Sequence, residues 1–367
     1  MTIRVLHILN SLGNGGAESF IFNMYRNINR DIIQFDFLLR SKDNNPFLID
    51  EVSRLGGEIY ITPEFPRYPL ANYKATDHFF EQHHDKYKVI HVHANALLYI
   101  TPFLLAKKYK IQSRILHSHN TATEKHLLYK EIHRFNRLFV SKLATHYFSC
   151  GYEAGEWMFK KKEFEIINNA IDTKKYIFNE EIKKKIRHDM KLENGFVIGH
   201  VGRFVEQKNH AFLIDIFNGI YNQNPKAYLI LIGDGELLPS IKEKVNQLNL
   251  SENVFFLGLR QDVTDLLQAF DVFVFPSLFE GLPIALIEAQ AAGLPCFVSN
   301  NISSKAKITD LVNFLSIEET SSLWADTILK KSADYLRTDM TKEIESNDFD
   351  IVENVEKIQQ IYMKMAN

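Results

Sequence analysis

The sequence predicts an α/β protein built from two doubly wound parallel sheets, one in each half of the chain. Short apolar runs such as residues 270–275 are rich in β-branched and aromatic side chains, which is typical of strands buried on both faces. These runs alternate with longer segments of helical periodicity, and such alternation indicates a parallel sheet. The chain has 367 residues, which is long for one core, so two domains are expected.

In the first half of the chain, the apolar runs predict six strands. They cover residues 3–9, 35–39, 89–93, 114–117, 145–150 and 165–167. Residues 17–28 are expected to form the first helix, because their apolar side chains recur on one face at helical spacing. Residues 168–172 are expected to form a turn, and the polar segment 173–193 is expected to link the two domains.

The second half repeats the pattern. Its expected strands cover residues 197–201, 228–232, 254–257, 272–275 and 296–299, and its helices 210–222, 237–248, 263–269 and 284–292. Open α/β sheets bind ligands at the carboxyl ends of their strands, and two such sheets facing each other would form a ligand cleft. The expected domains are residues 1–170 and 171–351.

Composition disfavours several classes of protein. The net charge is −2, so no overall field favours nucleic acid. Cys150 and Cys296 are the only cysteines, which disfavours a disulfide scaffold and fits a reducing compartment. The N-terminus lacks the pattern of a signal peptide, and no apolar run approaches the ~18–20 residues of a transmembrane helix. We therefore expect a cytoplasmic protein.

One segment departs from this neutral balance. Residues 106–147 hold nine Lys and Arg residues but two Glu residues, with apolar side chains interleaved. Such a segment predicts a basic amphipathic helix that lies on an anionic membrane surface, here the inner face of the cytoplasmic membrane. The alternative, a helix whose basic face is simply solvated, stays open.

The most informative segment covers residues 275–289. It joins an apolar strand to a helix through a turn that contains Gly281, and Pro283 suits the first turn of that helix. The unpaired N–H groups and the dipole of a helix start attract anions. Glu280 and Glu288, with seven residues between them, flank this turn. Because carboxylates repel phosphate, we expect them to bind hydroxyl groups, so the segment predicts a site for a nucleotide sugar.

A pair of cations lies in the loop after the strand 197–201. Arg203 and Lys208 follow Gly202 there. Two cations in this place would neutralise the charge that builds on a departing nucleoside diphosphate, and charge-assisted hydrogen bonds contribute about 1.5–3 kcal/mol each. Alone they would more often be a surface pair, so their interpretation depends on the neighbouring motifs.

Four segments together carry a resemblance to a known family. They are the pair Glu280 and Glu288, residues 14–18 with Gly15 and Gly16, residues 199–209 with Arg203 and Lys208, and residues 231–235 with Gly233 and Gly235. Taken in their order along the chain, they resemble the motifs of retaining glycosyltransferase family 4, whose members share the two-domain GT-B fold. Residues 117–120 and 288–295 look most like those of bacterial capsule and exopolysaccharide transferases.

The resemblance implies a role for each of these residues. Arg203 and Lys208 would bind the donor phosphates, Glu280 the donor hexose and Glu288 the ribose hydroxyls. The expected donor-binding residues are Gly15, Gly16, Gly202, Arg203, Lys208, Gly233, Gly235, Arg260, Glu280, Gly281, Leu282, Pro283, Ile284 and Glu288. The resemblance also implies that the final helix, near 352–367, crosses back onto the first domain.

Histidines supply further candidates. His119 follows the strand 114–117 and resembles the family's active-site histidine near the reacting sugar. His117, two residues earlier, stays open as its rival. His93 and His117 are weaker candidates for binding the acceptor, and His200, inside a strand, is expected to be structural.

No metal or other cofactor is expected. Asp348 and Asp350 spell the Asp-x-Asp of metal-dependent transferases, but they lie near the C-terminus and away from any phosphate loop. The resemblance implies that cations and helix ends replace a metal.

The predicted function is retaining transfer of a hexosyl unit from a nucleotide diphosphate sugar, expected to be UDP-linked, to a saccharide or lipid-linked saccharide. The expected catalytic residues are His119, Glu280, Arg203 and Lys208. No side chain stands out as a nucleophile for double displacement, and the resemblance implies same-face attack through an oxocarbenium-like state. Two alternatives stay open: a same-fold sugar-nucleotide epimerase, and a non-catalytic sugar-nucleotide-binding subunit of a polysaccharide assembly complex.

Overall fold

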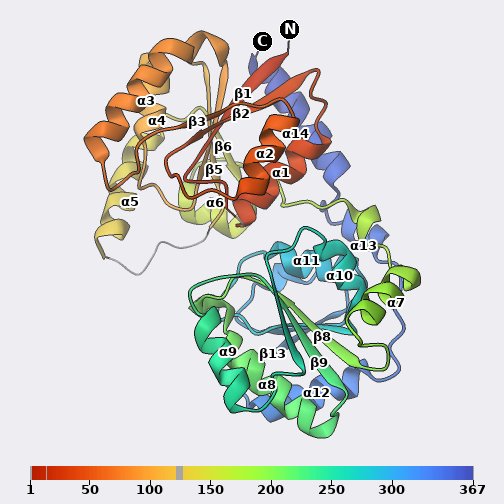
Figure 1. Ribbon diagram of the computed structural model, residues 1–367. Coiled ribbons are helices and arrows are strands. Elements are labelled where there is room, and N and C mark those ends of the chain that lie inside the picture. The colour runs from red at the N-terminus through yellow and green to blue at the C-terminus, as the bar shows by residue number, and fades with distance from the viewer. Residues whose placement is uncertain (1, 14, 121–126, 367) are drawn as a thin grey trace. The chain divides into compact units, whose positions relative to one another are not determined.

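The computed structural model describes residues 2–13, 15–120 and 127–366, which form two compact units (Figure 1). The first unit contains Met1–Ile171 and Asp350–Asn367, and the second contains Asp172–Phe349. Asn14 of the expected glycine loop and residues 121–126 of the basic segment lie outside the described residues.

The first unit is built on a seven-stranded sheet in which every neighbouring pair is parallel. Its strand order is β3-β2-β1-β4-β5-β6-β7. The strands are β1 (Ile3–Leu9), β2 (Ile33–Leu39), β3 (Ile59–Ile61), β4 (Val89–Ala94), β5 (Ser113–Ser118), β6 (His146–Ser149) and β7 (Glu165–Ile166). The order reverses direction between β1 and β4, as in a doubly wound sheet.

Helices cover both faces of this sheet, and alternate residues of each strand pack against opposite layers (Figure 1). Val5 belongs to the core under α1 and α14, whereas Leu6 belongs to the core under α3, α4 and α6. The helices are α1 (Gly16–Asn27), α2 (Pro46–Arg54), α3 (Pro69–His83), α4 (Thr101–Lys108), α5 (Leu127–Val140), α6 (Tyr152–Phe159) and α14 (Ile351–Ala366).

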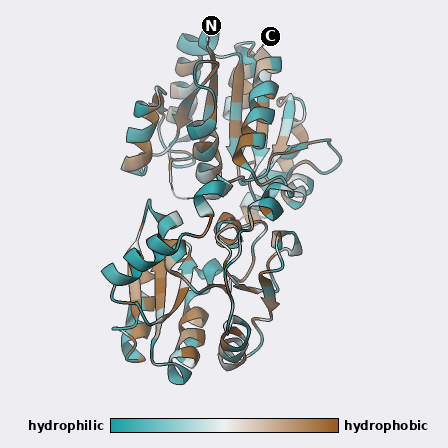
Figure 2. Ribbon diagram, turned by 90° about the vertical axis from the view of Figure 1, so that its right-hand side faces the viewer, coloured by the Kyte–Doolittle hydropathy of each residue, from teal (hydrophilic) through white to brown (hydrophobic). Residues whose placement is uncertain are grey.

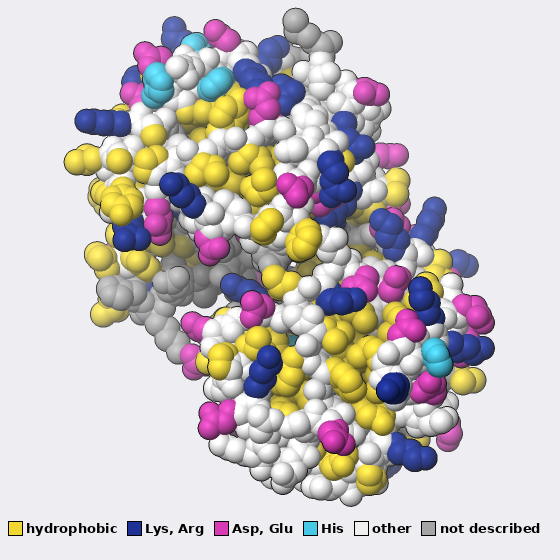
Figure 3. All heavy atoms as spheres, in the orientation of Figure 1, with side chains coloured by type: hydrophobic (Ala, Val, Ile, Leu, Met, Phe, Trp, Pro, Cys, Tyr) yellow, Lys and Arg dark blue, Asp and Glu magenta, His cyan; other side chains and the backbone are white. Residues whose placement is uncertain are grey.

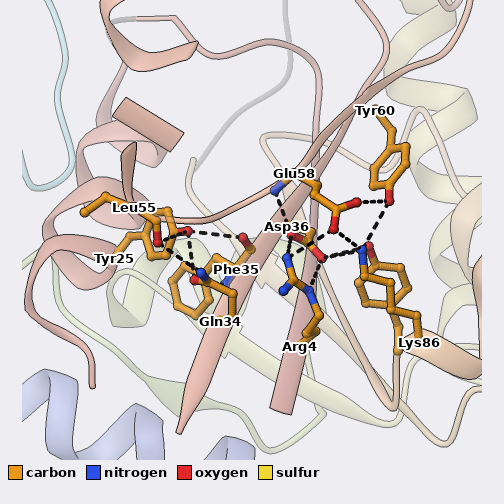
Figure 4. A network of polar contacts seen from close by, with 10 residues as sticks. Arg4, Tyr25, Gln34, Phe35, Asp36, Leu55, Glu58, Tyr60 and Lys86 are labelled. Atoms are coloured by element: carbon orange, nitrogen blue, oxygen red, sulfur yellow. Dashed lines mark hydrogen bonds and ion pairs between the residues drawn. The ribbon is translucent and has the colours of Figure 1, made fainter. Parts of the chain in front are cut away.

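One charged network in the first unit surrounds a buried carboxylate (Figure 4). Asp36 on β2 is fully buried and accepts hydrogen bonds from the Arg4 guanidinium at 2.7 Å and the Tyr87 hydroxyl at 2.8 Å. Burial alone would raise the pKa of Asp36, but these bonds, with one from the N–H of Glu58, hold it below its usual value. The carboxylate therefore stays charged and paired.

The second unit is built on a six-stranded sheet, also parallel, with the order β10-β9-β8-β11-β12-β13. The strands are β8 (Phe196–Val201), β9 (Ala227–Ile232), β10 (Val254–Gly258), β11 (Val272–Phe275), β12 (Cys296–Ser299) and β13 (Val312–Leu315). The helices are α7 (Glu180–Asp189), α8 (His210–Gln223), α9 (Leu238–Gln247), α10 (Val263–Ala269), α11 (Ile284–Ala291), α12 (Ser321–Ser332) and α13 (Thr341–Glu345).

The strands of this unit are mostly apolar, as the brown colour in Figure 2 shows, and the central strand β11 is apolar and buried at every position. Gly199 in β8 has a packing role, because a Cβ atom there would lie 1.9 Å from the ring of Phe270. The two parallel sheets confirm the predicted α/β class.

Two expectations about the segments between strands are wrong. Residues 173–193 do not form a linker but contain α7, which packs against α10 in the second unit. The buried Arg187 of α7 pairs with Asp271 at 2.7 Å, so this one charge, which looks exposed in the sequence, anchors the helix to the second unit. The basic segment 106–147 is not one helix, because the strand β5 lies within it. Of the described elements in this segment, α5 is the basic amphipathic helix.

Candidate active site

The expected phosphate and sugar residues meet at the carboxyl ends of two adjacent strands, β8 and β11. Strand order reverses here, since β8 continues to β9 on one side and β11 to β12 on the other. The loops that follow two such strands run to opposite sides and leave a crevice at the strand ends, where open α/β sheets bind ligands. Position in the sheet therefore brings these two loops together.

Lys208 and Glu280 form the central contact. The ammonium Nζ lies 2.6 Å from Oε1 of Glu280 and 4.5 Å from the centre of the Phe275 ring. The two side chains are only 16% and 12% exposed, so water screens the pair weakly. Backbone bonds hold both loops: the N–H of Leu278 donates to the carbonyl of Gln207 at 2.8 Å, and that of Ser303 to the carbonyl of Glu280 at 3.1 Å.

Two glycines let the loop after β9 pack against the loop after β8. Gly233 and Gly235 have φ angles of +140° and +157°. A Cβ atom on Gly233 would lie 2.1 Å from the carbonyl oxygen of Gly202, and one on Gly235 would lie 2.6 Å from that of Phe204. The glycine turn that the sequence predicts to bind the donor thus has a structural role of its own.

Glu288 lies in the second turn of α11 and has an unexpected partner. The Tyr176 hydroxyl donates a hydrogen bond of 2.9 Å to its Oε1 atom. Desolvation of the carboxyl group raises the pKa of Glu288 to about 7, although the bond from Tyr176 acts in the opposite direction. Tyr176 belongs to the segment that was expected to be a linker, and no sequence signal indicated this contact.

The remaining donor-binding candidates of this unit are placed less centrally. Arg203 is exposed, and its guanidinium has no ion-pair partner within the described part of the chain. Arg260 follows the outer strand β10, and its Nε atom donates to Asp262 at 2.8 Å. Within 281–284, Pro283 caps α11 instead of opening its first turn and has no N–H to offer, so the N–H groups of this segment belong to its other three residues.

The first unit carries the remaining candidates. Gly15 caps α1 with an ordinary φ of −94°, so its backbone does not require glycine. His119 follows β5 and keeps some exposed surface, whereas His117 is completely buried. This difference favours His119 over His117 as the histidine that reaches a ligand. The nearly buried His93 contacts His119, with 2.8 Å between Nδ1 and Nε2.

His200 and Asp350, neither of which the sequence places in the site, have structural partners. The Nδ1–H of the buried His200 donates to the carbonyl of Val274 at 2.8 Å. Asp350 accepts hydrogen bonds from the N–H groups of Val352 and Glu353 at the start of α14. These contacts explain Asp350 as a helix cap.

Comparison with known proteins assigns the family. The model of the family described as "Glycosyl transferases group 1" matches residues 179–346. The protein named "Putative glycosyltransferase EpsF" of Bacillus subtilis (strain 168) is 35% identical over 345 residues, which cover 90% of this chain and 88% of EpsF. This chain belongs to the group 1 glycosyltransferases. The predicted enzyme class is thereby confirmed.

Two further comparisons extend over most of this glycosyltransferase. A UDP-Gal:alpha-D-GlcNAc-diphosphoundecaprenol alpha-1,3-galactosyltransferase from Escherichia coli is 29% identical over 299 residues, which cover 77% of this chain and 76% of that protein. The crystal structure of Anabaena Alr3699/HepE in complex with UDP-glucose matches with a TM-score of 0.80 at 19% identity, covering 99% of this chain and 100% of that one. This likeness confirms the expected GT-B fold.

We expect the substitution Glu288→Gln to change how stability depends on pH. The folded-state pKa of about 7 lies above the usual 4.5, so the folded protein holds this proton more tightly than the unfolded chain. The stability from this group is complete below the unfolded pKa and is lost as the pH rises through the folded pKa. The variant should gain on the order of 3 kcal/mol relative to wild type across this window.

Urea unfolding of both proteins from about pH 5 to about pH 8 measures this difference. The exposed Glu252→Gln substitution serves as the control and should show no such trend. A difference between Glu288→Gln and wild type that stays constant with pH would contradict the raised pKa.

Proposed function

We propose that this glycosyltransferase moves a hexosyl unit, with retention of configuration, from a nucleotide diphosphate sugar to a saccharide or lipid-linked saccharide. The proposed donor is UDP-linked, and the proposed product is a bacterial capsule or exopolysaccharide. The observation that carries this proposal is the pair of Lys208 and Glu280 at the reversal point of the second sheet.

The pair suits a ligand that is anionic at one end and hydroxylated at the other. A diphosphate arriving at Lys208 would replace the carboxylate as its partner, and the exposed Arg203 would add a second cation. Glu280 would then accept hydrogen bonds from sugar hydroxyls. Negative charge develops on the diphosphate as the glycosidic bond breaks, so cations fixed there stabilise the transition state more than the ground state.

Glu288 suits the ribose end of the donor. With a pKa near 7, its carboxyl group carries less negative charge at neutral pH than an ordinary glutamate. It therefore repels a neighbouring diphosphate less, while its oxygens still accept hydrogen bonds from ribose hydroxyls. We propose that transfer is independent of metal ions, since Lys208 and Arg203 supply the positive charge.

The comparisons support the proposed donor and acceptor classes. HepE was crystallised with UDP-glucose, and the name of the Escherichia coli relative specifies a UDP-sugar donor and a sugar on diphosphoundecaprenol. A lipid-linked acceptor would bring the enzyme to a membrane surface. No helix in the described residues is long and apolar enough to cross a membrane.

Helix α5 offers a surface for peripheral contact. Its inner face is fixed, because His133 and Asn136 bond to the backbone of Leu97. Its outer face exposes Leu127, Leu128, Phe135, Leu138 and Phe139, and it carries Lys130, Arg134 and Arg137 against Glu131. Figure 3 shows hydrophobic and basic side chains mixed over this part of the first unit. We propose that this face binds anionic lipid, which suits both its charge and its apolar side chains.

We expect acceptor-dependent release of nucleoside diphosphate from one member of a panel of UDP- and GDP-sugars. The acceptor is a lipid-diphosphate-sugar extract. Lys208→Ala and Glu280→Ala should each lower kcat by about 10² to 10³, the range for removing one electrostatic stabiliser. Lys244→Ala is the matched control, because it breaks a Lys–carboxylate pair of 2.7 Å between Lys244 of α9 and Asp215 of α8, outside the loops that follow β8, β9 and β11. The anomer of the product, read by NMR, tests retention.

Other outcomes would identify the alternatives. Conversion of the donor without any acceptor would indicate an epimerase, and nucleotide binding without turnover would indicate a non-catalytic binding subunit. Activity lost in chelator would contradict metal independence.

We expect the double substitution Phe135→Ser with Leu138→Ser to weaken binding to anionic vesicles at least tenfold, because each exposed apolar side chain loses about 1.5–3 kcal/mol of burial. Lys130→Gln should weaken it about fivefold and only at low salt, since a basic residue near such a surface contributes about 1 kcal/mol. Vesicle co-sedimentation measures both effects.

The control is Leu323→Ser with Leu336→Ser, two leucines of the second unit that are 44% and 83% exposed. Equal loss in the control, or equal binding of wild type to zwitterionic vesicles, would contradict a specific role for α5.

A further inference from the structure

Five histidines line one face of the first sheet, and the sequence predicts a catalytic role for only one of them, His119. They are His7 on β1, His91 and His93 on β4, His117 on β5 and His119 just after it. Four are buried and His119 is partly exposed. Burial lowers the pKa of both His7 and His119 to about 3 and holds those of the others well below their usual value. All five rings are therefore neutral at neutral pH.

The histidines form two separate hydrogen-bonded rows. In row A, Nδ1 of His7 lies 2.9 Å from Nε2 of His93, whose Nδ1 lies 2.8 Å from Nε2 of His119. In row B, the Tyr362 hydroxyl of α14 lies 2.6 Å from Nδ1 of His91, whose Nε2 lies 3.0 Å from Nδ1 of His117.

Strand register explains why the rows exist. His7 is opposite His91, and His93 is opposite His117. Each ring-to-ring hydrogen bond joins a histidine to the residue that lies two positions beyond its directly opposite partner on the neighbouring strand. Residues two apart on a strand point to the same face, so the spacing in 91–93 and 117–119 builds both rows at once.

A shared metal ion is the obvious alternative, because His7, His91 and His93, and also His93, His117 and His119, place ring nitrogens close together. The ring planes argue against it. The lone pair of an imidazole nitrogen lies in the ring plane, so an ion must lie in the plane of every ligand. His91 and His93 stack with centres 4.2 Å apart at 20°, and His117 and His119 at 4.1 Å and 25°. Each triad thus contains two nearly parallel rings that do not converge on one ion.

Row A allows only two arrangements of protons. A neutral imidazole has one N–H donor and one bare nitrogen acceptor, so the ring of His93 must donate to one neighbour and accept from the other. In the first arrangement all three rings carry the proton on Nδ1, and His119 ends the row with a donor. In the second all three carry it on Nε2, and His7 ends the row with a donor.

The surroundings of the two ends favour the first arrangement. Neither Nε2 of His7 nor Nδ1 of His119 has a hydrogen-bond partner among the described residues. His7 is buried against Phe35, with ring centres 4.1 Å apart, and an unpaired N–H there would be costly. Both end atoms are shielded from solvent in the ligand-free protein. The residue His119 is nevertheless partly exposed in the loop after β5, so its end of the row, unlike that of His7 in the core, is the one where a ligand that displaces the covering groups would supply a partner.

We propose that His93, backed by His7, is a positioning residue for His119: row A holds the His119 ring in place and keeps its proton on Nδ1, so that this neutral ring presents one N–H donor to an oxygen of the sugar substrate. The proposal rests on the proposed function for the substrate, but the row itself does not. Row B contains no ring of row A and provides an internal control.

The row is tested first in the full-length wild-type protein with ¹⁵N-labelled histidine. Nitrogen–nitrogen couplings across the hydrogen bonds should link Nδ1 of His93 to Nε2 of His119, and Nδ1 of His7 to Nε2 of His93. The ¹⁵N shifts of His119 should be those of the Nδ1–H tautomer. Absence of both couplings, or an Nε2–H tautomer at His119, would overturn the proposal. The proposal would also be overturned if elemental analysis found a stoichiometric metal ion in the wild-type protein that is absent from His93→Phe.

His93→Phe and His91→Phe form a matched pair, since they make the same change on the same face of β4, two residues apart. His93→Phe should turn the His119 signal into a mixture of tautomers and lower kcat about tenfold or more, as when the partner that orients a functional histidine is removed. KM for the donor should change much less. His91→Phe should leave both the His119 tautomer and kcat near wild type.

The two readouts separate the row from the function. If the wild-type protein turns over no donor, the proposed function fails, but the couplings still show whether the hydrogen bonds of row A exist. Equal effects of both variants on the His119 signal would reduce row A to ordinary core packing. A changed tautomer with unchanged kcat would overturn the positioning role. Thermal unfolding of both variants identifies a folding defect, in which case the wild-type couplings decide.

Discussion

The reversal of strand order between β8 and β11 is the constraint on which the candidate site depends. It leaves the ends of two adjacent strands uncovered, and the sequence places a lysine loop on one end and a glutamate turn on the other. Removing either charge from water without a partner would be costly. The ion pair of Lys208 with Glu280 offsets that cost in the ligand-free protein. In the proposed function, the same pairing prepares the site for a donor, whose phosphates and hydroxyls would replace one partner for each charge.

The first unit handles buried polarity in a different way. Its histidines occupy positions that an ordinary parallel sheet would fill with aliphatic side chains. Each ring forms at least one hydrogen bond to another ring or to Tyr362. Nε2 of His7, Nε2 of His117 and Nδ1 of His119 have no partner among the described residues. Because all five rings are held neutral, the face gains directional bonds without the cost of buried charge. These directional bonds restrict how His119 is oriented.

The fold and the main loop motifs were predictable because they are local in sequence. Strands 272–275 and 296–299 agree with the structure residue for residue, since apolar runs and turns determine them. The segment 173–193 was misjudged because Arg187 looks solvated until Asp271, far along the chain, supplies its partner. Likewise, neither the bond from Tyr176 to Glu288 nor the histidine rows follow from composition, because they depend on packing and register between distant elements.

The central claim is that Lys208 serves the diphosphate and Glu280 serves the sugar. Calorimetric titration of the full-length protein with UDP and with its UDP-sugar tests this directly in Lys208→Ala and Glu280→Ala. The account predicts opposite effects on UDP: Lys208→Ala weakens its binding, whereas Glu280→Ala binds it at least as tightly as wild type, because the ammonium group loses its competing carboxylate. Glu280→Ala should also lose any extra affinity that the attached sugar provides. If both variants weaken UDP binding equally and neither changes the preference for the sugar, the pair is only a structural brace and the account is contradicted.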